Sequence, residues 1–190
     1  MLNIDFKKLF TEGFETRNGD IRVPTSFSTA CQHVAVIFQC QSQVQFGGVG
    51  SVHIDYDLEP FVKMSFAKHF LDGMEWITDN GVEYDKKELE RLSIDSPLYD
   101  EQPKVKAYAM AMLKREMKQS AEALYHNLNS LESRAGSQVP FTSINFGRDT
   151  TPEGRMVSEA MLRASLAGIG KFHRTAIFPI SIFQYKCGWT

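Results

Sequence analysis

The sequence predicts an α/β protein in which long helices alternate with the strands of a parallel or mixed sheet. Stretches such as residues 104–133 lack glycine and proline and carry apolar residues at helical spacing. Short runs rich in β-branched and aromatic residues, such as 139–146 and 176–186, lie between the helical stretches. Strands joined by long helices are usually parallel neighbours, because a parallel pair needs a long crossover.

The first half of the chain predicts three helices. Ser26 can cap the second of them, and Gly47-Gly48 should end it. Asp57 can cap the third. The expected elements are a short helix over 6–14 ended by Gly13, a polar turn over 16–20, an extended piece over 21–23, a helix from 26 to about 45, an extended piece over 49–55 and a helix over 58–78.

Residues 83–103 are acidic and are broken by Pro97 and Pro103, which predicts a short helix plus a mobile loop insert. The helix over 104–133 follows. Its expected buried side consists of Ala107, Met110, Ala111, Met117 and either Leu124 or Leu128. Its lysines alternate with Glu116, Glu122 and Glu132, which favours a solvated face over a surface that binds anions.

The stretch VPFTSINFG predicts a strand that stops at Gly147 and has one packed and one polar face. Thr151 then suits an N-cap, and Pro152 suits the first position of a helix over 152–167. Gly168 or Gly170 should end that helix, since a phosphate loop would have to precede a helix. A last strand is expected over 176–186, interrupted near its start by Pro179.

Composition excludes several function classes. A net charge of −2, a pI near 6.2 and dispersed basic residues favour neither nucleic acid nor an anionic membrane as a partner. The chain has no apolar run of spanning length and no signal-peptide core, so a cytoplasmic location is expected. Cys31, Cys40 and Cys187 are too few for a disulfide framework, and the first two should be packed core thiols.

Several longer stretches resemble one known family in order and type. They are LNIDFKKLFTEGF, PTSFSTACQHVAVIFQCQSQVQFGG, LEPFVKMSF, SRAGSQVPFTSINFG with TPEGR, and RTAIFPISIFQYKCG. Together they resemble the catalytic subunit of anaerobic, class III ribonucleoside-triphosphate reductases, the oxygen-sensitive glycyl-radical enzymes that make deoxynucleotides. The resemblance implies a ten-stranded α/β barrel, of which residues 1–190 would be a single internal segment.

In that family a thiyl radical on a cysteine inside the barrel attacks the ribose, and a glycyl radical generates it. The sequence holds no RVCGY-like glycyl motif, no zinc-binding CxxC pairs and no ATP-cone. Cys187 is not expected to be the radical cysteine, which lies farther downstream in the family, and the other redox cysteine would lie just before Leu2. No catalytic residue is therefore expected here, and reduction of ribonucleotides would need the missing parts. The alternative is a noncatalytic remnant that binds nucleotides or a protein.

The resemblance also implies partners. They are a ribonucleoside triphosphate as substrate, a second copy or a complementing reductase chain, and a radical-SAM activating enzyme. ATP and dNTP effectors would bind among helices of a dimer interface, for which the helices over 26–45 and 58–78 are the candidates. The segment itself is expected to hold no cofactor.

Candidate site residues fall into three groups. Ser26, Ser28 and Thr29 open a long helix, where hydroxyls and free N–H groups suit a phosphate, although plain N-capping also explains them. The polar strand face should present Gln138, Ser143 and Asn145 to a substrate cavity. Gly47 and Gly48 would allow close backbone approach, and a plain turn explains them equally.

Two further groups of residues are weaker candidates for a site. His53, Asp55 and Asp57 alternate and could chelate a metal from a strand, but helix capping by Asp57 and surface chemistry at the other two explain them better, so no metal is expected. Thr150-Thr151 with Arg155 is a second candidate anion site at a helix start.

Overall fold

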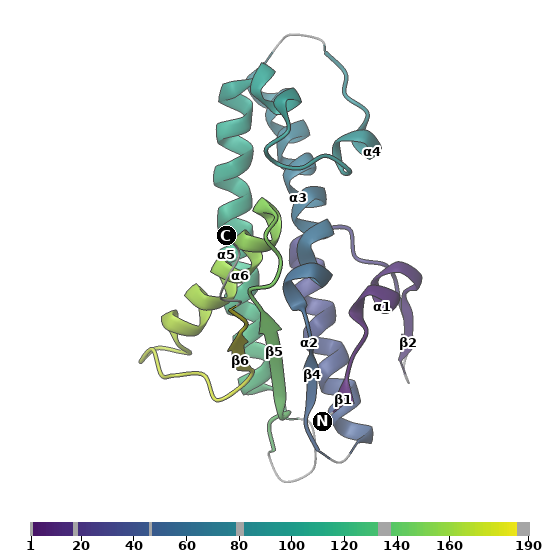
Figure 1. Cartoon of the computed structure of the whole chain (residues 1–190), viewed down its shortest axis with the longest axis vertical. Helices are drawn as coiled ribbons and strands as arrows, with labels where there is room; N and C mark the ends of the chain where they lie inside the picture. The colour runs from purple at the N-terminus through teal and green to yellow at the C-terminus, as the bar shows by residue number, and fades with distance from the viewer. Residues whose placement is uncertain (1, 17–18, 46, 79–81, 133–137, 186–190) are drawn as a thin grey trace.

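Four parallel strands and the helices that connect them make up the main part of the computed structural model (Figure 1). The structure describes all residues except 1, 17–18, 46, 79–81, 133–137 and 186–190. Its elements are β1 (Leu2–Asn3), α1 (Phe6–Glu12), β2 (Phe14–Thr16), β3 (Gly19–Ile21), α2 (Phe27–Val44), β4 (Val49–Ser51), α3 (Ile54–Ile77), α4 (Lys86–Leu89), the 3-10 helix η1 (Pro97–Glu101), α5 (Pro103–Ser130), β5 (Thr142–Phe146), α6 (Pro152–Ala167) and β6 (Ile180–Phe183). The α/β prediction is confirmed.

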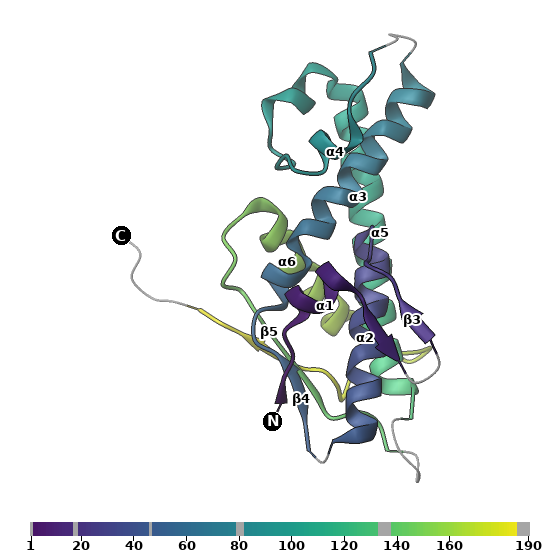
Figure 2. The ribbon, with the colours of Figure 1, turned by 90° about the vertical axis from the view of Figure 1, so that its right-hand side faces the viewer.

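The sheet has the order β1-β4-β5-β6, and each neighbouring pair is parallel. Each new strand therefore joins the sheet at the same edge. Because parallel crossovers have one hand, and all of them here move toward that edge, their helices fall on the same face of the sheet. In Figure 2, β4 and β5 lie to one side and α2 and α5 to the other. The opposite face of the sheet carries no helix among the described residues. A separate antiparallel hairpin, β2–β3, spans the turn expected over 16–20.

Most of the core lies between the helices. α3 and α5 pack closely, since a Cβ added to Gly73 would come within 2.9 Å of the side chains of both Val105 and Tyr108. Aromatic rings fill the rest, with Tyr99 in edge contact with Phe66 and Phe70. These helices thus form a closely packed layer beside the sheet.

Capping residues predicted two helix starts correctly. The Ser26 hydroxyl accepts a hydrogen bond from the N–H of Thr29 at 3.2 Å, and α2 begins at the next residue. Thr151 caps α6 in the same way, with Pro152 in the first helical turn and Gly168 at the end. Both caps use only local geometry, which explains why the sequence alone revealed them.

The start of α3 is a correction. This helix begins at Ile54, four residues before the predicted start, so Asp57 lies inside it and is not its cap. Nor is Asp55 a surface residue. It is fully buried, and one of its carboxylate oxygens accepts the N–H groups of Gly147, Arg148 and Asp149 at 2.8 to 2.9 Å. The first turn of α3 therefore fixes the turn between β5 and α6.

The buried side of α5 is also a correction. Met117, Leu124 and Leu128 are buried as expected, but Ala107 and Ala111 are exposed. The buried positions of the helix are instead occupied by residues two positions away, among them Ala109 and Leu113. Alanine is compatible with either environment, so it determines the helix face poorly.

Residues 83–103 form a short helix plus loop, as expected, but they pack more tightly than a mobile insert would. Leu89, Ile94 and Tyr99 are buried. The Tyr99 hydroxyl donates to the carbonyl of Leu89, and the carboxylate of Glu153 on α6 accepts the N–H of Ile94 at 2.8 Å. Glu153 thereby attaches this segment to the rest of the protein.

The C-terminal strand is shorter than expected and begins after Pro179, at the edge of the sheet. Asn129 of α5 positions its approach by accepting the N–H groups of Ile177 and Phe178. Of the cysteines, Cys31 is buried as expected, whereas Cys40 is exposed and not a core thiol. Cys187 lies outside the described residues.

Substitution Asp55→Ala should lower the free energy of unfolding by about 3 kcal/mol, because it leaves buried backbone N–H groups without an acceptor. Urea denaturation of the 190-residue chain measures this. Glu75→Ala, at an exposed position on the same helix, is the control and should change the stability by less than about 0.5 kcal/mol. Equal stability of the two variants would contradict the role assigned to Asp55.

Candidate functional site

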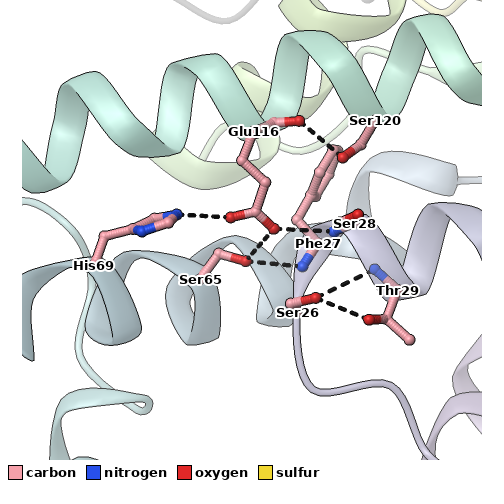
Figure 3. A network of polar contacts seen from close by, with 8 residues as sticks. All are labelled: Ser26, Phe27, Ser28, Thr29, Ser65, His69, Glu116 and Ser120. Carbon is pink, nitrogen blue, oxygen red and sulfur yellow. Dashed lines mark hydrogen bonds and ion pairs between the residues drawn. The ribbon is translucent and has the colours of Figure 1, made fainter. Parts of the chain in front are cut away.

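A carboxylate from α5 occupies the N-terminus of α2 (Figure 3). Glu116 accepts the N–H of Ser28 at 3.1 Å and the hydroxyl of Ser65 at 2.9 Å through one oxygen. Its other oxygen lies 2.8 Å from Nε2 of His69. Ser65 in turn accepts the N–H of Phe27. One acidic side chain thus joins three helices.

The charge of Glu116 is well compensated. Burial by itself would raise the pKa of this carboxyl, but the hydrogen bonds from His69, from the Ser28 N–H and from Ser65 outweigh it and bring the pKa below its usual value. The positive end of the α2 dipole acts in the same direction. The carboxylate is therefore ionised at neutral pH and serves as the anion at this helix start.

This arrangement bears directly on the predicted phosphate site. Ser26 and Thr29 are brought together, with their hydroxyls 3.0 Å apart, but both take part in the cap of α2. The N–H of Ser28 is bonded to Glu116. The capping explanation is confirmed for Ser26, with Thr29 as its partner, and any ligand phosphate would have to bind beside Glu116.

An open groove of about 730 Å³ adjoins the network. Its lining comes from the start of α2, the middle of α3 and the outer side of α5. Lys68 and Arg115 supply positive charge, and Gln119 supplies an amide. Neither cation forms an ion pair with another residue in the part of the chain that the structure describes. The groove can thus accept an anionic group without breaking an existing pair.

The bare face of the sheet holds the second predicted group. Ile144 and Phe146 of β5 are packed, but Ser143 is buried as well and only Asn145 is half-buried, so burial does not separate a packed face from an open one; Phe141 is half-exposed and not part of the packed side. Ser143 lies between Gly50 and Ile180 in register, and Asn145 lies beside Ile182. The side-chain oxygen of Asn145 is buried and accepts no hydrogen bond from any described residue.

The remaining predicted residues lie elsewhere. Gly47 has a φ of 106°, and the carbonyl of Gly48 accepts the N–H of Leu2 at 3.0 Å. Both belong to the turn between α2 and β4, which agrees with the plain-turn explanation. Gln138 is exposed, four residues before β5. The structure therefore does not bring the candidate residues into one site, since the α2 start, the bare sheet face and the glycine turn are separate places.

The two weaker candidate groups, at the start of α3 and at the start of α6, do not form a binding site. Thr151 caps α6, and its N–H donates to the Asp149 carboxylate, so its own neighbours satisfy that helix start. His53 and Asp57 approach within 3.3 Å across one helical turn, while Asp55 is bonded to the backbone. Within the described ranges no three histidine, cysteine or acidic side chains gather in a way that could hold a metal ion.

Sequence reasoning missed Glu116, Ser65 and His69. The charge pattern predicts a solvated face for Glu116, yet its side chain is only 17% exposed. Its partners are 47 to 88 residues away in sequence, so no local pattern indicates them. The one available signal was an acid among the lysines of α5, which surface helices also show.

Substitution Glu116→Gln should lower the free energy of unfolding at pH 7 by about 1 to 3 kcal/mol, because the charge-assisted hydrogen bonds from α5 to both α2 and α3 are lost. A glutamate whose pKa is lowered by folding stabilises fully above its unfolded pKa of about 4.3. That stabilisation disappears as the pH falls through the folded pKa. The difference between wild type and variant should therefore shrink below about pH 4.

Urea denaturation across this pH range measures the difference, with Glu122→Gln on the same helix as the control. A difference that did not change between pH 7 and pH 3 would mean that the side chain stabilises only by packing.

Comparison with known proteins identifies a family. Residues 2–190 match the family model described as anaerobic ribonucleoside-triphosphate reductase. Three curated relatives carry that same name. The chain is 32% identical to the Escherichia coli K12 protein over 97% of the chain and 22% of the relative, 29% identical to the Haemophilus influenzae protein over 97% and 23%, and 28% identical to the Enterobacteria phage T4 protein over 93% and 25%.

The chain thus spans a quarter or less of the length of these relatives. In the part that the structure describes, no helix is long and apolar enough to cross a membrane. The match extends over almost every residue, from β1 to beyond β6. The chain therefore belongs to the anaerobic ribonucleoside-triphosphate reductase family.

Proposed function

We propose that this chain forms part of the barrel wall of an anaerobic enzyme that reduces ribonucleoside triphosphates to deoxyribonucleotides by radical chemistry. The observation that carries the proposal is the family match over residues 2–190. The parallel sheet with its helices on one side is consistent with it. The family's glycyl and thiyl radical residues have no counterpart in this sequence. The contribution of the chain is then to bind and orient nucleotides, together with the rest of the enzyme.

The unpaired edge of the sheet is consistent with the proposed barrel. Ile180, Ile182 and Phe183 of β6 are 44 to 56% exposed, and the outer edge of β6 pairs with no described strand. An edge with exposed apolar residues is unfavourable in water and prone to pair with another strand. A fifth strand beyond β6 would continue the barrel, with the bare face turned toward its interior.

The bare face is the proposed substrate surface. Ser143 and Asn145 project from it, and Ser143 lies beside Gly50 in register. The unpartnered Asn145 oxygen can accept a hydrogen bond from a ribose hydroxyl or a base amine. Gln138 would lie at the border of this surface. Apolar neighbours such as Ile182 would exclude water from the bound sugar.

The groove beside Glu116 is the proposed effector site. Two of its walls belong to the helices expected to carry this site, α2 and α3, and α5 supplies the third. Lys68 and Arg115 would bind the phosphates of ATP or a dNTP, and Gln119 can hydrogen-bond a base or sugar. In this proposal the helices face a second reductase chain in a cytoplasmic dimer, which a radical-SAM enzyme activates.

Substitution Asn145→Ala in the complete reductase that carries this segment should lower kcat/KM for nucleotide reduction by about 10 to 100 fold, as expected for a lost polar contact to the substrate. Anaerobic assays after activation measure it. The control is Gln32→Ala, which removes an exposed amide from α2 and should leave the rate unchanged. An unchanged rate in Asn145→Ala would contradict the proposed substrate surface.

Substitutions Lys68→Ala and Arg115→Ala should each weaken binding of ATP or dNTP effectors by about tenfold, because each removes a charge-assisted phosphate contact. Calorimetry on the same enzyme measures the affinity. The control is Lys118→Ala, which removes an exposed charge from α5 outside the groove. If Lys118→Ala weakened binding as much as the others, overall charge and not the groove would account for the effect.

A further inference from the structure

A second groove, of about 350 Å³, lies between α5 and α6, which pack against each other. We call it the α5–α6 groove. Only these two helices line it among the described residues, and its α5 residues lie on the opposite side of that helix from those of the proposed effector site. Its floor is apolar and consists of Met117, Met156, Ala160 and Ala164. Met117 and both alanines are buried, so the floor is already packed.

This floor suits another helix. The small side chains of Ala160 and Ala164 allow a neighbouring backbone to come close, and the flexible side chain of Met156 can adapt to what lies on it. Leu166, three residues after Arg163 of the groove lining and thus on the same side of α6, is 86% exposed. The apolar surface therefore continues beyond the groove, as it does at sites that bind an amphipathic helix.

The charges of the groove are unequal on its two sides. Lys114 and Lys118 line the α5 side, and neither forms an ion pair with a described residue, Glu122 one turn farther along included. On the α6 side, Nε of Arg163 lies 2.7 Å from a carboxylate oxygen of Glu159. Glu159 is the one acid among the described residues that line the groove. The lining thus has a positive surplus, and all of it lies on α5.

The spacing of the two lysines distinguishes between possible occupants. Lys114 and Lys118 are one turn apart, which places their backbones about 6 Å apart along α5. An anion with a single charged end, such as a fatty acid, would meet only one of them. A helix with acidic residues four positions apart presents two carboxylates at the same spacing.

We propose that the α5–α6 groove docks an amphipathic helix of a separate protein, with an apolar stripe and carboxylates one turn apart along one flank. The stripe lies on the methionine and alanine floor, and the carboxylates pair with Lys114 and Lys118. The other flank meets the Glu159–Arg163 pair and needs no net charge. Because the groove is separate from the proposed substrate and effector surfaces, docking there can occur together with nucleotide binding.

Two helical peptides of about 18 residues test this, each with the same leucine stripe and the same composition. One carries its glutamates along a flank of the stripe, and the other carries them on the face opposite the stripe. The flank peptide should cause saturable NMR shifts in the Met156 methyl group of the 190-residue chain, with a Kd on the order of 100 μM. The Met64 methyl group, outside the groove, should not shift. The second peptide should bind about tenfold more weakly, since it loses both ion pairs.

Variants identify the residues responsible. Lys114→Gln and Lys118→Gln should each weaken binding of the flank peptide by about three- to fivefold. Lys104→Gln, at an exposed position of α5 outside the groove lining, should not. Lys114→Glu combined with Lys118→Glu should instead bind a peptide whose flank glutamates are replaced by lysines. This gain of binding cannot come from misfolding, and circular dichroism checks the fold of each variant.

Four results would overturn the proposal. They are no saturable shift at Met156, equal binding of the two peptides, an equal effect of Lys104→Gln and Lys114→Gln, and binding of decanoate as tightly as the flank peptide. The other occupants are tested as well. If the complete reductase does not bind the labelled peptide in fluorescence anisotropy, its remaining parts cover the groove. If the chain dimerises in sedimentation and the lysine-to-glutamate variant does not, a second copy occupies it. Either result also overturns docking of a separate protein.

Discussion

Parallel pairing of the strands is the constraint on which the rest of the structure depends. A parallel neighbour can be reached only by a long crossover, and here every crossover adds its strand to the same growing edge. Among the described residues, the helices α2, α3, α5 and α6 consequently pack against one another as one layer. The molecule has two unlike faces as a result, one made of packed helices with grooves between them and one made of bare strands.

Buried carboxylates hold this arrangement together. Asp55 binds the turn after β5, Glu116 binds the start of α2, and Glu153 binds the segment before α5. In each case a carboxylate oxygen accepts one or more backbone N–H groups of a distant segment. A protein with one apolar core and few inter-helical ion pairs thereby gains directional contacts, which apolar packing does not provide.

Local signals in the sequence were sufficient for most elements and insufficient for the site. Ser26 and Thr151 marked their helices because a cap acts over three residues. Asp57 led to a wrong helix start because an acid near the start of a helix can be its cap or an internal residue. Here it is internal, and it lies next to His53, one turn earlier. The contacts of Glu116 join residues from three helices, and only the folded chain brings them together.

The register of the sheet also governs the order in which the protein can assemble during synthesis. β4 finds its neighbour β5 only after α3, the 83–103 segment and α5 have been made, since almost half of the chain separates the two strands. α3 and α5 can pack against each other before that. Until β5 leaves the ribosome, β4 has only β1 beside it, so the helical layer would have to act as the template on which the sheet is completed.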